Sequence, residues 1–119
     1  MQRLKGKAVV IGLGGLGGYV VEELARLNID ELVLIDGDSF TESNMNRQIG
    51  ATFSALGKNK AEVTAERVKD ISLSNVVCVP ERFCKENASV IDDADIVIDC
   101  VDNIKTRLLI EEECEKRNK

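Results

Sequence analysis

The residues best suited to chemistry begin with a glycine cluster, because VVIGLGGLGGYVVEEL at residues 9–24 holds five glycines within seven positions. Gly12, Gly14 and Gly17 fit the spacing G-x-G-x-x-G, and Asp36 ends a second apolar run nineteen residues later. Such glycines permit a tight turn, let main-chain N–H groups approach a phosphate and allow close packing of a helix. The Asp36 carboxylate would accept hydrogen bonds from ribose hydroxyls. The pattern predicts a nucleotide site, although a tight strand-to-helix turn alone would also use these glycines.

A long polar loop, DGDSFTESNMNRQIG at 36–50, exceeds the usual two to six residues of a strand-to-helix connection and is therefore a candidate for function. It contains Arg47, and Lys60 follows near the first turn of the next predicted helix. A positive charge at a helix N-terminus opposes the helix dipole, so an anion nearby would relieve it. The two cations would flank a polyphosphate, arginine as a planar fork and lysine as a point charge. A solvated surface pair is the alternative.

Polar side chains also end the last apolar run, DIVIDCVDN, as Asp99, Asp102 and Asn103. In an open α/β sheet, ligands bind at the carboxyl edge where the strand order reverses, so Gly14 and Asp102 should face the same crevice. A carboxylate beside phosphates is repulsive unless a cation bridges them, and Mg²⁺ commonly uses one or two carboxylates plus phosphate oxygens. We assign Asp102 to Mg²⁺. For Asp99 we expect a structural role, either partly buried or capping the following helix.

The elements that must position these residues alternate along the chain. Apolar runs predict four strands covered on both faces, at 7–12, 31–36, 76–80 and 94–100. Amphipathic segments predict helices over 16–27, 60–71 and 87–91 and from 103 onward. The apolar face predicted for the first helix comprises Leu16, Val20, Val21, Leu24 and Leu27, and that of the second comprises Ala61, Ala65, Val68 and Ile71. The alternation favours an α/β fold: a Rossmann-like open parallel sheet with strands in the order 3-2-1-4 and helices on both faces.

Composition narrows the function classes. The 119 residues suffice for one domain, and a net charge of −5 argues against broad electrostatic attraction to nucleic acid or to an anionic membrane. A chain without a leader or an 18-residue apolar run is expected to be cytoplasmic. The four cysteines show no CxxC pair and are expected to be buried, inert thiols. Because the net charge is negative, any phosphate site must be a local one and cannot depend on a broadly basic surface.

Five motifs together resemble the adenylation domain of the ThiF/MoeB/HesA family, which is related to the ubiquitin-activating enzymes. They are GLGGLG at 12–17, DGD at 36–38, SNMNRQ at 43–48, GKNKA at 57–61 and DCVDN at 99–103. The resemblance implies an enzyme, an adenylyltransferase that binds ATP and Mg²⁺. It would activate the C-terminal Gly-Gly carboxylate of a ubiquitin-like sulfur-carrier protein as an acyl-adenylate and release pyrophosphate. Relatives adenylate other carboxylates, including one on a modified tRNA nucleoside.

Carried over by position, the resemblance assigns ribose to Asp36, phosphates to Asn44, Arg47 and Lys60, a supporting place near them to Gln48, and the metal to Asp102. The full set of nucleotide-binding residues expected from the motifs is Gly12, Gly14, Gly15, Gly17, Asp36, Asp38, Asn44, Asn46, Arg47, Gln48, Lys60, Asp102 and Asn103. Arg47, Lys60 and Asp102 are the expected catalytic residues. Attack of a carboxylate on the α-phosphorus requires charge neutralisation and alignment more than a base, so the chemistry needs no histidine.

Parts of the family pattern have no counterpart here. Only six residues precede the first predicted strand, and Arg3 does not match the arginine that some members contribute to a neighbouring subunit. The zinc-binding CxxC pairs and the reactive cysteine of relatives belong to a later region. We therefore expect residues 1–119 to be the N-terminal, ATP-binding portion of an adenylation domain, truncated relative to the full family fold. It would bind ATP weakly and would not complete a cycle alone.

The expected partner is the sulfur-carrier protein, and the full-length form is expected to be a homodimer. No membrane is expected, and no nucleic acid unless the protein is a tRNA-modifying relative. Two alternatives stay open. The first is a NAD(P)-binding Rossmann oxidoreductase domain, which explains the sequence as far as Asp36 but not the loop beyond it. The second is a non-catalytic nucleotide-binding domain.

Overall fold

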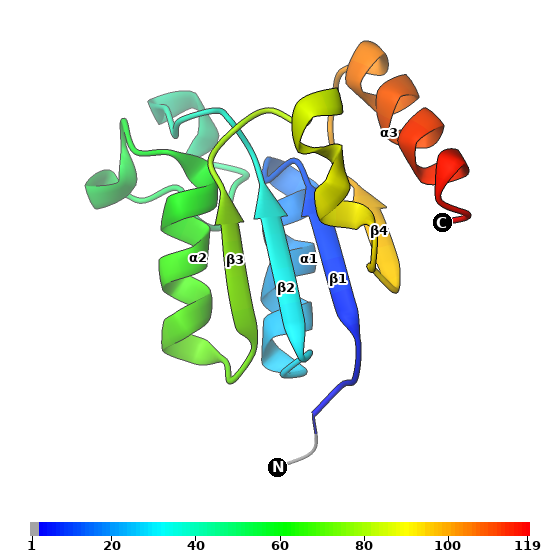
Figure 1. Ribbon diagram of the computed structural model, residues 1–119. Helices are drawn as coiled ribbons and strands as arrows, with labels where there is room; N and C mark the ends of the chain where they lie inside the picture. The colour runs from blue at the N-terminus through cyan, green and yellow to red at the C-terminus, as the bar shows by residue number, and fades with distance from the viewer. Residues whose placement is uncertain (1–2) are drawn as a thin grey trace.

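Four parallel strands form one open sheet in the computed structural model, which describes residues 3–119 (Figure 1). The strands are β1 (Lys7–Ile11), β2 (Glu31–Ile35), β3 (Asn75–Val79) and β4 (Ile96–Asp99). They lie in the order β3-β2-β1-β4, and every neighbouring pair is parallel. The predicted Rossmann-like sheet of order 3-2-1-4 is confirmed. The strand order reverses between β1 and β4, which is where open α/β sheets bind ligands.

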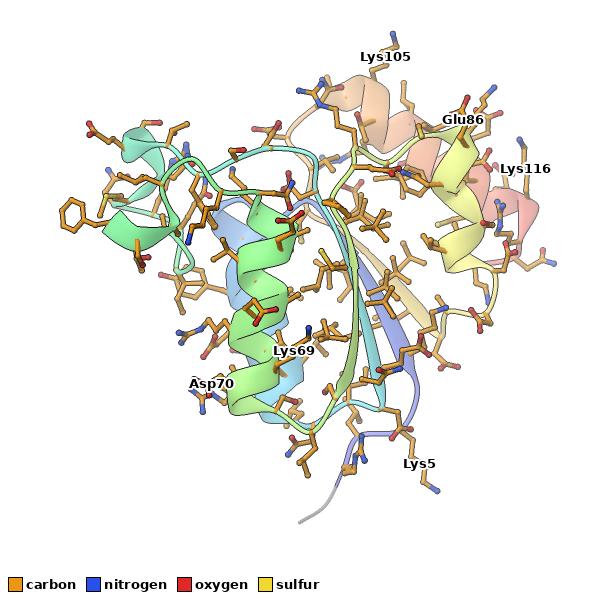
Figure 2. All side chains as sticks on the ribbon, turned by 60° about the vertical axis from the view of Figure 1, so that its left-hand side comes forward. Lys5, Lys69, Asp70, Glu86, Lys105 and Lys116 are labelled. Atoms are coloured by element: carbon orange, nitrogen blue, oxygen red, sulfur yellow. The ribbon has the colours of Figure 1, made fainter. Side chains whose placement is uncertain are left out.

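Helices cover both faces of the sheet, as predicted. The α-helices are α1 (Gly15–Arg26), α2 (Lys60–Ile71) and α3 (Ile104–Lys116), and the 3₁₀ helices are η1 (Glu42–Asn44), η2 (Phe53–Ala55) and η3 (Lys85–Ile91). The first two α-helices pack on one face, and η3 and α3 pack on the other (Figure 1). The charged side chain of Asp70 of α2 points away from the sheet (Figure 2). None of the helices in the described residues is long and apolar enough to cross a membrane.

The two central strands form the core, because alternate residues of β1 and β2 enter opposite layers. Val10 and Leu34 pack toward α1 and α2, whereas Val9 and Val33 pack toward η3 and α3, and all four are at most 2% exposed. The prediction of strands covered on both faces is therefore right for β1 and β2. It is wrong for the edge strands, where at least one apolar side chain of each remains exposed, namely Val77 and Ile96.

The buried face of α1 differs from the predicted one. Gly17, Gly18, Val21 and Ala25 are buried, whereas Leu27 is exposed and Leu16 is 68% exposed. The glycines let α1 approach the sheet closely, so the contact line runs through positions 17, 21 and 25, one helical turn apart. Each residue rotates the helix by about 100°, which turns position 16 away from that line. The predicted face of α2 is confirmed, with its alanines and Val68 buried and Ile71 partly buried.

The four cysteines are free thiols, and each is partly buried rather than fully buried as predicted. Cys78 on β3, Cys100 after β4 and Cys114 on α3 pack against the buried core clusters without being fully buried, and Cys84 lies just before η3. Burial raises the pKa of the Cys78, Cys100 and Cys114 thiols. A raised pKa lowers the thiolate fraction at neutral pH, which agrees with inert side chains.

One ion pair links the end of α3 to the end of η3, beside the apolar packing of Ile110 and Leu109 on the core. Arg117 contacts Asp92 at the end of η3 at 2.5 Å and Glu113 one turn earlier at 3.0 Å. Glu113 is only 5% exposed, and hydrogen bonds from Lys116 and Arg117 lower the pKa of its carboxyl. These contacts hold the helix that follows the last strand, and with it the residues that α3 contributes to the cleft described below.

A bidentate ion pair joins the two helices on the other face. Arg67 of α2 donates from Nε to one oxygen of Glu22 at 2.7 Å and from Nη2 to the other at 3.1 Å. The hydrogen bond from Arg67 lowers the pKa of the Glu22 carboxyl. The pair therefore stabilises the fold fully above the ordinary carboxyl pKa of about 4.3, and this stabilisation is lost as the pH falls through the lower folded-state pKa.

We expect Glu22→Gln to reduce the free energy of unfolding at pH 7 by about 1 kcal/mol, measured by urea denaturation. The deficit should shrink toward pH 3, because acid protonates the wild-type carboxyl as well. Glu23→Gln is the matched control, since Glu23 is exposed beside it on α1. An equal deficit for Glu22→Gln at both pH values would contradict the assignment.

Candidate functional site

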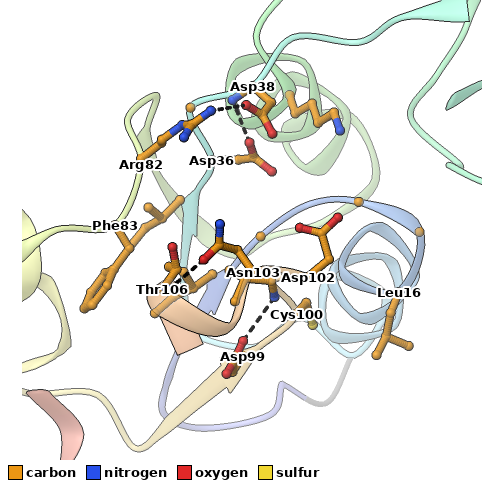
Figure 3. A pocket seen from close by; sticks show the side chains of 18 of the residues that line it. Leu16, Asp36, Asp38, Arg82, Phe83, Asp99, Cys100, Asp102, Asn103 and Thr106 are labelled. Atoms are coloured by element: carbon orange, nitrogen blue, oxygen red, sulfur yellow. Dashed lines mark hydrogen bonds and ion pairs between the residues drawn. The ribbon is translucent and has the colours of Figure 1, made fainter. Parts of the chain in front are cut away.

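A cleft of about 690 Å³ opens at the carboxyl ends of the strands, above the point where the order reverses between β1 and β4 (Figure 3). Eleven of the thirteen residues predicted from sequence line it: Gly12, Gly14, Gly15, Asp36, Asp38, Asn44, Arg47, Gln48, Lys60, Asp102 and Asn103. The other two, Gly17 and Asn46, do not line it. Asn46 is exposed, and Gly17 is buried beneath the turn.

The glycine turn between β1 and α1 has little room for side chains. Gly12 has φ +94°, and a Cβ there would lie 2.9 Å from the Cys100 carbonyl group. A Cβ on Gly17 would lie 2.0 Å from the Gly12 oxygen, so Gly17 sets the distance between helix and turn. The backbone at Gly14 is open, and no side chain of the described residues caps α1. The first N–H groups of α1 are therefore available to an anion in the cleft.

Asp36 follows β2 and holds two turns together. One carboxylate oxygen accepts the Leu13 N–H at 2.7 Å, and the other accepts the Asp38 N–H at 2.7 Å. Sequence reasoning foresaw only the ribose role and missed these main-chain contacts. Each carboxylate oxygen offers about two acceptor positions, so both can still accept a ligand hydroxyl. Asp36 thus connects the glycine turn to the start of the long polar loop.

Lys60 begins α2 and is only 8% exposed. Its ammonium lies 5.7 Å from the centre of the Phe40 ring and has no ion pair with any described residue. The Asn59 side chain fixes the start of this helix, because it accepts the Glu62 N–H at 3.0 Å and donates to the Asp36 carbonyl at 3.0 Å. The side chain as a whole is therefore largely buried, while its ammonium lacks a counter-ion among the described residues. An anion in the cleft would supply that counter-ion.

Arg47, Asn44 and Gln48 come from the loop between β2 and α2. The Arg47 side chain is exposed at the cleft and forms no ion pair with the described residues. Asn44 is buried, and its side-chain oxygen accepts the Thr41 N–H at 2.9 Å. Gln48 is 6% exposed and lies against Gly14, and its Oε1 has no hydrogen-bond partner in the described part of the chain. An orphaned buried amide that lines a cleft is typical of a group that a ligand or water completes.

The end of β4 and its connection to α3 carry three of the polar groups (Figure 3). Asp102 is exposed and lines the cleft. Asn103 caps α3, because its Oδ1 accepts the Thr106 N–H at 3.0 Å. Asp99 is partly buried, as predicted, and it accepts hydrogen bonds from the Val101 N–H and from Arg107. The suggestion that Asp99 caps the helix is wrong, since four residues separate it from the first turn and Asn103 occupies the capping position.

Among the remaining lining residues, four lie outside both the predicted strands and the sequence motifs: Arg82, Phe83, Thr106 and Arg107. Arg82 forms an ion pair with Asp38 at 3.4 Å at the mouth of the cleft (Figure 3). The first two follow β3, and the carboxyl ends of parallel strands meet at one edge of a sheet. This rule could have identified the residues after β3 as part of the cleft, although the sequence there contains no motif.

The side chains that the described residues offer limit how a metal ion could be bound. Among residues 3–119, no group of three or more histidine, cysteine, aspartate or glutamate side chains could hold an ion. A preformed protein cage for a metal is therefore lacking in this part of the chain. Magnesium is often bound by one or two carboxylates, with substrate phosphates and water completing its shell, and the single exposed carboxylate of Asp102 fits that pattern.

Comparison with known proteins gives a consistent family match. The model of the ThiF family matches residues 2–119. The tRNA threonylcarbamoyladenosine dehydratase of Haemophilus influenzae is 46% identical over 113 residues, which cover 92% of this chain and 43% of that protein. The SAMP-activating enzyme E1 of Haloferax volcanii is 35% identical over 113 residues, covering 93% of this chain and 42% of that protein.

A solved structure extends the comparison to a nucleotide complex. The crystal structure of the Escherichia coli tRNA N6-threonylcarbamoyladenosine dehydratase in complex with ATP has a TM-score of 0.84 and 31% identity to this chain. The match covers 95% of this chain and 48% of that one. The chain thus spans less than half the length of each of these three relatives.

Proposed function

Because the chain belongs to the ThiF family, we propose that residues 1–119 form the ATP-binding portion of an adenylyltransferase. One observation carries the proposal: Arg47 and Lys60, without carboxylate partners in the described residues, line the same cleft as Asp102 and the uncapped start of α1. The ATP complex of a structural relative supports the same ligand class. An arrangement of unpaired cations opposite one carboxylate suits a polyphosphate with its metal better than it suits NAD.

In this proposal the triphosphate lies at the N-terminus of α1, flanked by Arg47 and Lys60, while Asp36 accepts the ribose hydroxyls. The unpaired Oε1 of Gln48, whose side chain lies near Gly14, can accept a hydrogen bond from a donor of the ligand or from water. Asp102 would hold Mg²⁺, which supplies neutralisation of the phosphate charge. A substrate carboxylate oxygen bonds to the α-phosphorus, and the bond from that phosphorus to the bridging oxygen breaks. Pyrophosphate leaves with the electron pair, and no proton needs to move.

Two classes of carboxylate fit this reaction. The sequence motifs favour the Gly-Gly terminus of a ubiquitin-like sulfur carrier, and the SAMP-activating relative supports that class. The 46% identity to a tRNA threonylcarbamoyladenosine dehydratase favours a carboxylate on a modified tRNA nucleoside as the second candidate. Assaying ATP–pyrophosphate exchange by the complete gene product with each substrate separates the two. Exchange with neither substrate, despite ATP binding, would favour a non-catalytic nucleotide-binding domain.

The nucleotide preference of the 119-residue chain tests the proposal directly. We expect MgATP at ten times its dissociation constant to stabilise the fold by about 1.4 kcal/mol, which raises the melting temperature by about 5 °C. NAD at the same concentration should give no comparable shift, because the cleft offers two unpaired cations for a triphosphate. Calorimetric titration of both nucleotides checks the ranking. A preference for NAD would reject the adenylyltransferase in favour of an oxidoreductase domain.

A further inference from the structure

The ion pair between Asp99 and Arg107 forms hydrogen bonds with both the N–H and the carbonyl of Val101, the residue before Asp102. The Val101 N–H donates to Oδ1 of Asp99 at 3.0 Å, and the Val101 carbonyl accepts from Nη2 of Arg107 at 2.7 Å. Arg107 also donates from Nε to Oδ2 of Asp99 at 3.1 Å, which closes the ring of contacts. The two side chains thereby fix the peptide groups on both sides of Val101.

The glycine turn also packs closely against the same segment. A Cβ on Gly12 would lie 2.9 Å from the Cys100 carbonyl and from the Val101 nitrogen, and a Cβ on Gly17 would lie 3.3 Å from the Cys100 side chain. The backbone at Cys100 and Val101 is therefore held both by close packing against the turn and by the hydrogen bonds of Asp99 and Arg107. Few alternative paths remain for the chain as it leaves β4.

Asp102 depends on this support, because its own side chain has no hydrogen bond or ion pair with the described residues. A peptide group is planar, and the plane that contains the Val101 carbonyl also contains the nitrogen and Cα of Asp102. Fixing that carbonyl therefore fixes where the Asp102 side chain leaves the backbone. Removing the Arg107 contact would free the plane to rotate.

We propose that Arg107 is a positioning residue: together with Asp99 it fixes the peptide plane before Asp102 and so holds that carboxylate at the metal side of the cleft. This inference rests on the proposed function, in which Asp102 binds Mg²⁺ with the phosphates of ATP. Arg107 acts through the backbone. A lysine cannot replace it, since one ammonium does not reproduce the two directed contacts of the guanidinium fork.

The test measures the affinity of the 119-residue chain for ATP by calorimetry, once with Mg²⁺ and once in EDTA. The ratio of the two dissociation constants gives the gain due to the metal. We expect Arg107→Gln and Arg107→Lys to reduce this gain about tenfold, the loss typical of removing a group that orients a metal ligand, and to leave metal-free binding unchanged. Asp102→Asn should abolish the gain. Lys105→Gln is the charge-matched control, because Lys105 points outward from the same helix (Figure 2).

Each outcome discriminates. An unchanged gain in both Arg107 variants overturns the inference while the proposed function stands. Weaker metal-free binding in Arg107→Gln, restored in Arg107→Lys, also overturns it, because that result shows a direct contact with the phosphates. A wild-type chain that binds no ATP, or binds it without a metal-dependent gain, rejects the proposed nucleotide or metal site and the inference with it.

A second measurement uses the free protein and needs no nucleotide. Amide hydrogen exchange at Val101 should accelerate in Arg107→Gln and stay at the wild-type rate in Lys105→Gln, because only the former loses the contact that holds Asp99 and the Val101 carbonyl. Unchanged exchange at Val101 would show that Arg107 does not fix this segment and would overturn the inference independently of ATP binding.

Discussion

Replacing Lys60 with methionine will slow ATP–pyrophosphate exchange by the complete gene product several hundredfold or more while the fold stays intact. Two unit charges about 4 Å apart interact by ~4 kcal/mol at an effective dielectric near 20, and this energy corresponds to almost a thousandfold in rate. Methionine keeps the apolar character of the buried side chain but removes the ammonium and, with it, the cation–π contact with the Phe40 ring. Arg47→Ala should have an effect of similar size, because the two cations flank the same phosphates.

Lys58→Met is the control for this prediction, because Lys58 lies two residues earlier, is exposed and does not line the cleft. It should leave the exchange rate unchanged. Thermal denaturation of each variant separates a loss of reaction from a loss of folding. Wild-type exchange rates in the Lys60 and Arg47 variants would refute their assignment to the phosphates, and with it the main support for the proposed function.

Gly17→Val is expected to destabilise the fold by about 3 kcal/mol or more, a large share of the 5–15 kcal/mol that typically separates folded from unfolded domains. The first atom of any side chain at position 17 would meet the Gly12 oxygen at 2.0 Å and the Gly12 carbonyl carbon at 2.9 Å. Both are backbone atoms, so relief requires α1 to move away from the turn. Urea denaturation followed by circular dichroism measures the loss.

Gly15→Ala is the stability control, since a Cβ there would lie 3.6 Å from the Arg47 oxygen, an ordinary contact distance. Its backbone is helical, and alanine in a helix costs less conformational entropy than glycine, so its stability should equal or exceed that of the wild type. A Gly17→Val variant as stable as Gly15→Ala would show that α1 does not depend on the close approach at Gly17.

The sheet and most of the cleft could be predicted because their causes are local in the sequence. Continuous branched aliphatic runs specify β1 and β2, and right-handed crossovers then leave few strand orders. The carboxyl-edge rule brings Gly14 and Asp102 into one cleft without further information. The structure confirms the order and places both residues there.

The features that could not be predicted depend on how segments that are separate in the sequence approach one another in the fold. The face of α1 follows the glycines, which carry no apolar signal, so Leu16 was expected on the buried side although it is exposed. The capping role of Asn103 depends on where β4 ends. Arg107 enters the cleft because helical geometry brings it back beside Asp99, and the burial of Gln48 depends on how the long loop folds over Gly14. The binding roles of these residues stay predictions.

The two main-chain contacts of Asp36 affect how sugar recognition can be studied. A substitution at this position would leave the amide hydrogens of Leu13 and Asp38 without their acceptor, so any loss of affinity would mix local rearrangement with the missing ribose contact. Deoxynucleotides avoid this confusion. ATP analogues without the 2′- or the 3′-hydroxyl delete the donors of the ligand one at a time, and the protein keeps its native backbone throughout.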